Sequence, residues 1–289
     1  MIRKPAVAGL FYEGNPDSLK KQIEACFKHQ LGPGKIPEKI GDKRNITGVV
    51  VPHAGYAYSG PVAVNSYYQI AEDGLPETFI VIGPNHTGMG SGVSAMLEGT
   101  WRTPIEDMEI DQEFAQKMVQ NAGIIDSDPQ AHIQEHSVEV QLPFLQYLQK
   151  KSSASLEFVP VCMWMQDMET AIDVGNSIYE TAEELNRDVV VVASTDFTHY
   201  RPREIAHKND MQVLDAIKSM DENLMFSRVA ALNITMCGYG PVAAAMIASK
   251  KMGASNCEVE RYATSGDTTG DYSSVEAPIF FDAIIAAAT

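Results

Sequence analysis

The chain has 289 residues, 45% of them hydrophobic and 21% charged, so it is long and apolar enough to bury a large core. Its formal net charge of −16 repels phosphate backbones, so we expect no nucleic-acid partner. The sequence holds no apolar run near the roughly 18 residues that a membrane span needs, and its start lacks the long apolar stretch of a signal peptide.

The alternation of apolar runs and amphipathic stretches predicts a series of helices and strands. In chain order we expect a helix (18–30), a strand (46–53), a helix (61–73), two strands (77–84 and 92–99), two helices (110–123 and 137–150), a strand (155–163), a helix (167–185), a strand (188–197), two helices (204–220 and 241–253) and two strands (258–265 and 275–284). Continuous Val and Ile runs between helices are typical of a mostly parallel sheet covered on both faces.

The chain shows no linker, repeat or low-complexity tract that would divide it. The long turn-rich segment 31–45 joins the first helix to the first strand of the sheet, and the polar, Gly-rich segment 264–274 is expected to be a solvated loop. We therefore predict one α/β domain over 1–289. It should have three layers, αβα, with a central parallel or mixed sheet whose last strand or two run antiparallel.

Histidines follow two of the predicted strands. His53 stands in PHAGYAYSG and His86 in GPNHTG, while the strand 188–197 leads into STDFTHY, which contains Asp196 and His199. Ligands of parallel α/β sheets bind beyond the carboxyl ends of the strands, so these side chains converge if the strands are neighbours. Each histidine taken alone is more often a structural residue than a ligand.

Four cysteines are present, and they form no CxxC pair. Cys26, Cys162 and Cys257 lie in apolar or strand contexts typical of small core residues. A chain of this size needs no disulfides, so we expect free thiols and a reducing, cytoplasmic setting. Cys237 differs, because it precedes two glycines and a predicted helix in TMCGYGP, where a helix N-terminus should lower the pKa of its thiol.

Two histidines and one thiolate make a metal-ligand set with a vacant fourth position, which is typical of a working site rather than a closed structural one. Imidazole and thiolate suit iron, zinc or copper and disfavour magnesium and calcium. Asp196, His136 and His199 would then remain for proton transfer or for orienting the ligands.

The segment AHIQEHSVEVQ places Glu135, His136 and Glu139 at the predicted start of a helix, which Ser137 could cap. Glu135 or Glu139 could support His136 in proton transfer. The two tyrosines of PHAGYAYSG, Tyr56 and Tyr58, are expected at the pocket mouth, although both could simply pack in the core.

Six ordered sequence blocks resemble the Memo family, whose microbial members are called AmmeMemoRadiSam system protein B. The blocks are RKPAVAGLFYEGNP, PHAGYAYSG, GPNHTG, QEHSVEVQLPFL, STDFTHY and MCGYGP. The resemblance implies a fold like that of the class III extradiol dioxygenases. It also implies a metal site formed by His53, His86 and Cys237, with Asp196 and His199 close by.

One position departs from the dioxygenases, which bind ferrous iron with two histidines and a glutamate. Here the third ligand would be Cys237, and a thiolate changes the charge and redox tuning of the metal, so dioxygenase activity does not carry over with the fold. The resemblance also implies a functional association with radical-SAM and AMMECR-type proteins.

We therefore expect a metal-dependent oxidoreductase that acts on an unknown small molecule or peptide. Iron is the expected metal, with zinc and copper as alternatives. His199, held by Asp196, is the first acid/base candidate, and His136 with Glu135 or Glu139 is the second. Two other functions stay open: a non-catalytic module that binds a peptide or protein in the same cleft, and a hydrolase in which the metal activates water.

Overall fold

The computed structural model describes residues 1–152, 155–199, 201–270 and 279–287. Among these residues, eight strands form the main sheet. Their spatial order is β10 (Ala254–Thr264), β11 (Ile279–Ala287), β2 (Ile46–Val51), β9 (Val189–Ser194), β3 (Thr78–Pro84), β8 (Glu157–Met163), β4 (Val93–Ala95) and β7 (Asp126–Ser127). The four central strands, from β2 to β8, pair in parallel. β11 and β4 join them antiparallel, so the sheet is mixed, as expected.

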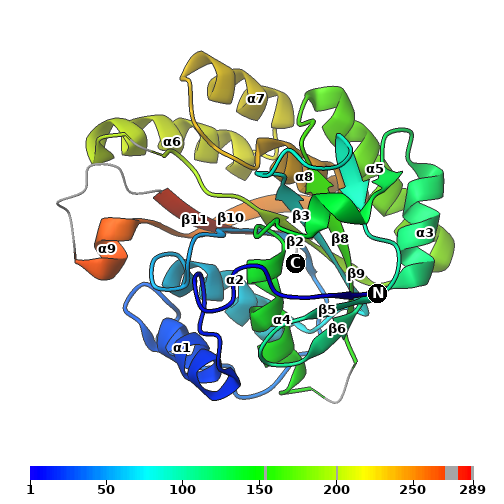
Figure 1. Cartoon of the computed structure of the whole chain (residues 1–289). Coiled ribbons are helices and arrows are strands. Elements are labelled where there is room, and N and C mark those ends of the chain that lie inside the picture. The colour runs from blue at the N-terminus through cyan, green and yellow to red at the C-terminus, as the bar shows by residue number, and fades with distance from the viewer. Residues whose placement is uncertain (153–154, 200, 271–278, 288–289) are drawn as a thin grey trace.

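Helices cover both faces of this sheet (Figure 1), which confirms the predicted three-layer αβα architecture. One layer contains α1 (Pro16–Lys28), α2 (Gly60–Asp73) and α4 (Leu142–Gln149). The opposite layer contains α3 (Gln112–Asn121), α5 (Met168–Leu185), α6 (Arg203–Lys218), α7 (Glu222–Ala231) and α8 (Tyr239–Lys251). Of the helices that the structure describes, none is both long and apolar enough to cross a membrane.

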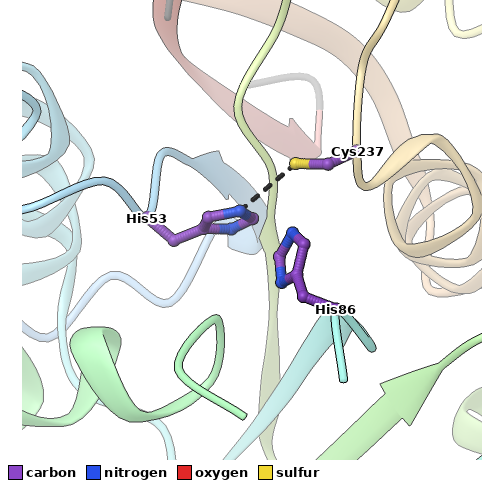
Figure 2. Close-up of side chains that lie close together, drawn as sticks. All are labelled: His53, His86 and Cys237. Carbon is purple, nitrogen blue, oxygen red and sulfur yellow. Dashed lines mark hydrogen bonds between the residues drawn. The ribbon is translucent and has the colours of Figure 1, made fainter. Parts of the chain in front are cut away.

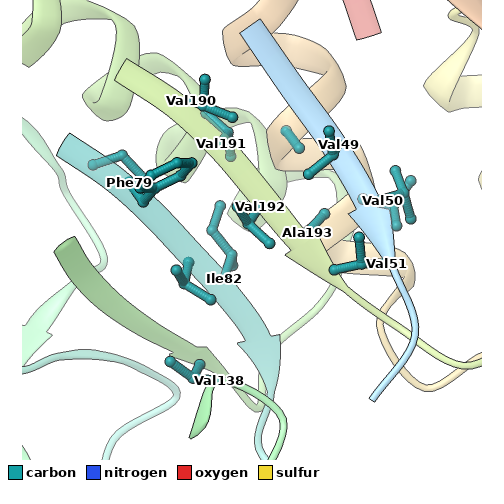
Figure 3. Close-up of a cluster of buried hydrophobic side chains, with 14 of the residues drawn as sticks. Val49, Val50, Val51, Phe79, Ile82, Val138, Val190, Val191, Val192 and Ala193 are labelled. Atoms are coloured by element: carbon teal, nitrogen blue, oxygen red, sulfur yellow. The ribbon is translucent and has the colours of Figure 1, made fainter. Parts of the chain in front are cut away.

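The centre of the molecule is built from the apolar strands β2, β9 and β3 (Figure 3), of which β2 and β9 are rich in valine. Val50, Val192 and Ile82 are fully inaccessible to solvent, because helices cover both faces of these strands. This burial explains why the strands read as continuous apolar runs rather than alternating patterns. Helices α5 and α8 pack closely at Gly175, where an added Cβ atom would lie 2.8 Å from the carbonyl oxygen of Ala244.

A second, three-stranded sheet was not predicted. It contains β1 (Ile2–Arg3), β5 (Thr100–Arg102) and β6 (Asp107–Glu109). Strands of two or three residues are too short to show a periodic pattern. The guanidinium of Arg3 lies 4.2 Å from the ring centre of Trp101, which is fully buried.

The other differences between the predicted and the observed elements are local. The predicted helix 137–150 begins as a 3-10 turn, η2 (Glu139–Gln141), and Ser137 does not cap it, because its hydroxyl donates instead to the carbonyl oxygen of Pro84. A second 3-10 turn, η1 (Pro129–His132), was not predicted. The expected loop 264–274 contains a short helix, α9 (Ser265–Thr269). Residues 271–274 of that loop and 275–278 of the expected last strand lie outside the described residues.

Candidate metal centre

The order of the central strands brings the candidate residues together. β9 lies between β2 and β3, parallel to both, with Val51 beside Ser194 and Ile82 beside Ala193. His53, Asp196 and His86 each follow the end of one of these strands by two residues. Their side chains therefore meet at the carboxyl edge of the sheet.

Cys237 reaches the same edge from the loop before α8 (Figure 2). Candidate ligand atoms of His53, His86 and Cys237 all lie within 4.8 Å of one another. Of these atoms, His53 Nε2 and Cys237 Sγ lie 3.2 Å apart. His53 is buried, Cys237 is partly buried and the side chain of His86 keeps 34% of its exposure, so the group is open to solvent on the His86 side.

His53 is held both by its main chain and by its ring. Its main-chain N–H donates to Asp196 Oδ1 at 2.9 Å, and its Nδ1 lies 2.9 Å from the hydroxyl oxygen of Ser194. Nε2 is thereby left facing Cys237. Burial lowers the pKa of His53 well below its ordinary value, and the neighbouring His136 and His86 lower it further, so the ring is neutral.

Cys237 is bound to the β9 exit by its main chain and its sulfur. Its N–H donates to the Asp196 carbonyl oxygen at 3.2 Å, and Sγ accepts the N–H of Asp196 at 3.2 Å. Burial raises the pKa of the thiol, and the charge of Asp196 raises it further. The lowering of this pKa predicted from the helix N-terminus is therefore wrong for the metal-free chain, in which burial and the charge of Asp196 raise it.

Glu135 orients His86. Its Oε1 lies 3.0 Å from His86 Nδ1, and its other oxygen accepts the His86 main-chain N–H at 2.5 Å. The amides of His136 and Ser137 also donate to this carboxylate, each at 2.8 Å. Burial alone would raise the pKa of Glu135, but the hydrogen bond and charge of His86, together with His136 and the Ser137 amide, lower it to about 2. The carboxylate only accepts, so His86 Nδ1 donates and Nε2 is left for a ligand.

His136 lies among the candidate ligands. Its ring centre is 4.7 Å from that of His86, in a stacked arrangement, and 5.4 Å from that of His53. Phe11 contacts its ring at 4.8 Å between centres. Burial lowers the pKa of His136 to about 4, even though the charge of Glu135 opposes this. A neutral imidazole at this position can accept a proton.

Thr235 contacts His199 through its hydroxyl and its carbonyl oxygen, and the expectation that Asp196 holds His199 stays a prediction. The main-chain N–H of His199 donates to Thr235 Oγ1 at 2.7 Å, and Nδ1 lies 3.0 Å from the Thr235 carbonyl oxygen. Asp196 accepts the main-chain N–H of His53. Burial raises the pKa of Asp196 to about 6, although the His53 amide and the charges of His199 and His86 oppose the shift.

Glu139 lies in the core and holds the N-terminal segment. It forms an ion pair with Arg3, accepts the amides of Ala6 and Val7 at 2.7 and 3.1 Å, and accepts the Tyr12 hydroxyl at 2.6 Å. With this many donors on one buried carboxylate, the geometry favours an anchoring role for Glu139 over proton transfer.

Of the two tyrosines expected at the pocket mouth, Tyr56 is instead a core residue. It is 2% exposed, its hydroxyl donates to the Val140 carbonyl oxygen at 2.6 Å, and its ring stacks on Phe144 at 4.3 Å. Tyr58 is 48% exposed and lines a cavity of about 240 Å³ together with Phe11.

Sequence reasoning missed three residues that support the site: Ser194, Gln141 and Thr235. Ser194 and Gln141 are fully buried polar residues in apolar segments. That pattern is a usable signal, because a buried polar side chain needs hydrogen-bond partners. No sequence signal singles out Thr235, which lies far along the chain from His199.

Known proteins match this chain over nearly its whole length. Residues 3–277 match the profile of the family described as Memo-like protein. The chain is 54% identical, over 275 residues, to the MEMO1 family protein MTH_45 of Methanothermobacter thermautotrophicus, covering 95% of this chain and 98% of that one. It is also 54% identical to MK0963 of Methanopyrus kandleri (95% and 96% covered) and 50% identical to MJ0403 of Methanocaldococcus jannaschii (95% and 96% covered).

A solved structure, an uncharacterized protein (JW3007) from Escherichia coli K12, matches 82% of this chain and 99% of its own, with a TM-score of 0.49 and 11% identity. That likeness is too weak to add to the assignment. The profile match and the relatives, each spanning nearly the full length, are decisive without it: the chain belongs to the Memo family.

Proposed function

We propose that the chain is a metal-dependent oxidoreductase in which His53, His86 and Cys237 hold one transition-metal ion. The observation that carries the proposal is the placement of three candidate donor atoms within 4.8 Å of one another at the carboxyl edge of the sheet. In both histidines Nδ1 already has a partner, Ser194 or Glu135, which leaves Nε2 for the metal.

The donor chemistry fits such an ion. Two neutral imidazoles and a thiolate are the ligands of iron, copper and zinc, and three protein ligands leave a coordination position for substrate or water. When bound, iron or copper would supply electron-transfer or oxygen chemistry. We take iron as the first metal to test, and a small molecule or peptide as the substrate.

Within this site, His136 is the residue placed to move a proton. Its ring contacts both histidine ligands, and burial keeps it neutral, with a pKa of about 4. The same feature supports a second candidate function, metal-dependent hydrolysis, in which His136 would accept a proton from water. The metal found in the protein separates the two functions, since zinc supports hydrolysis and not redox chemistry.

The test is metal analysis of protein purified without oxygen. We expect one equivalent of metal in the parent and a large loss in His53→Ala, His86→Ala and Cys237→Ala. Cys257→Ala is the matched control, because it removes a buried thiol outside the site. Equal metal content in all five proteins would refute the site.

Whether the site is catalytic needs a second measurement. Azide or cyanide should perturb the spectrum of the iron- or cobalt-loaded parent if a position is open to ligands. An inert spectrum, with a fourth protein ligand in the coordination shell, would favour the non-catalytic binding module.

A further inference from the structure

Behind His53, on the side away from Cys237, lies a fully buried serine with three polar neighbours. Ser194 Oγ is 2.7 Å from the carbonyl oxygen of Ser137, 2.9 Å from Gln141 Nε2 and 2.9 Å from His53 Nδ1. A hydroxyl group has one proton to donate and two positions that accept. Three neighbours therefore use all of its hydrogen-bonding positions, so one of them accepts from the hydroxyl and the other two donate to it.

The hydroxyl proton goes to Ser137, because a carbonyl oxygen can only accept. The amide of Gln141 must present Nε2 on this side, since Nε2 also lies 3.0 Å from the carbonyl oxygen of Pro52, another acceptor. Its Oε1 accepts the Tyr67 hydroxyl at 2.8 Å, which agrees with that orientation. Gln141 therefore donates to Ser194.

One contact remains, to His53 Nδ1. Ser194 has already given its proton to Ser137, so the bond to His53 exists only if Nδ1 carries the hydrogen and donates it. We propose that Ser194 and Gln141 are positioning residues that hold the His53 imidazole as its Nδ1–H tautomer, with a bare Nε2 directed at Cys237 Sγ. These hydrogen bonds fix the His53 tautomer without a bound metal.

The consequence for metal binding rests on the proposed function. A histidine coordinates through an unprotonated nitrogen, and a partner on the other ring nitrogen fixes which one is free. The two candidate histidine ligands are fixed differently: exposed His86 by a carboxylate, and buried His53 by a neutral hydroxyl. A neutral partner suits the buried position, since a second buried carboxylate would need its own compensating donors.

The direct test is a long-range ¹H–¹⁵N correlation spectrum of the metal-free, ¹⁵N-labelled protein, which reports which ring nitrogen carries hydrogen. Comparison with His53→Ala assigns the His53 signals. We expect the Nδ1–H form in the parent. In Ser194→Ala, Nδ1–H loses its hydroxyl acceptor, while Nε2–H could donate to Cys237 Sγ, so the signals should move toward the Nε2–H form.

Two further variants keep the test specific. Ser194→Thr retains the hydroxyl and should keep the parent tautomer. Ser177→Ala removes another buried serine hydroxyl, one that donates to the Val174 carbonyl oxygen in α5, and should leave His53 unchanged. An Nε2–H signal in the parent, or an unchanged signal in folded Ser194→Ala, would overturn the inference.

A metal titration of the same proteins separates this inference from the proposed function. If both hold, Ser194→Ala should bind cobalt(II) or zinc ~10–100-fold more weakly than the parent, the usual effect of losing a partner behind a metal ligand. A parent that shows the Nδ1–H form and the shift in Ser194→Ala, but binds no metal, would refute the proposed function and leave the positioning role supported.

Discussion

Metal binding by this chain should release a proton from Cys237 and therefore tighten as the pH rises. In the metal-free protein the thiol is protonated, because burial raises its pKa, and the thiolate is the form that binds a metal. Each pH unit below the thiol's pKa should then change the affinity tenfold, or ~1.4 kcal/mol. Between pH 7 and pH 9 the expected gain is about a hundredfold, from this one proton.

The raised pKa of Cys237 widens the pH range over which the metal affinity should rise, compared with an ordinary cysteine. An exposed thiol with a pKa of roughly 8.5 would stop contributing above that pH, whereas here the tenfold slope should continue beyond pH 9. Cobalt(II) affinity, measured by competition with a chelator of known pH dependence, gives the slope, and the thiolate-to-cobalt absorption band identifies the ligand. A parent whose affinity levels off by pH 8 would refute the reasoning, and Cys257→Ala should follow the parent.

Three further predictions concern the surroundings of the site and the fold. Glu135→Gln should weaken metal binding ~10–100-fold, since the carboxylate that holds His86 is lost; an unchanged Kd for cobalt would contradict this. Burial lowers the pKa of His132 to about 4, so the parent should lose about 2 kcal/mol of folding free energy between pH 6.5 and 5 as the unfolded chain takes up the proton first. His132→Phe should lack that part of the loss in urea unfolding, and an identical pH dependence would refute the assignment. Gly175→Ala should destabilise the fold by about 1–3 kcal/mol in the same assay, because its Cβ would meet the α8 backbone at 2.8 Å, whereas no change would mean that α5 and α8 can move apart.

Much of the fold was predictable because its central strands are buried on both faces. The valine runs of β2 and β9 are continuous rather than alternating, which indicates strands buried on both faces. The glycine, proline and polar residues that follow these runs mark the ends of the strands. α7 was missed because its buried residues, Met225 and Val229, are few and the helix lies at the edge of its layer.

The site was predictable only as far as strand ends and turns reveal it. His53 and His86 follow apolar strands, and parallel pairing brings such ends together. The partners of these residues come from contacts between distant parts of the chain. Thr235 beside His199, and Arg3 beside Glu139, are set by tertiary packing that leaves no local sequence pattern.

The central claim is that His53, His86 and Cys237 bind one metal ion, and X-ray absorption spectroscopy of the zinc-loaded protein tests it most directly. We predict one sulfur neighbour at ~2.3 Å and two imidazole nitrogens at ~2.0–2.1 Å, with the sulfur absent in Cys237→Ala. A shell of oxygen and nitrogen alone in the parent, or a sulfur that persists in Cys237→Ala, would contradict the claim.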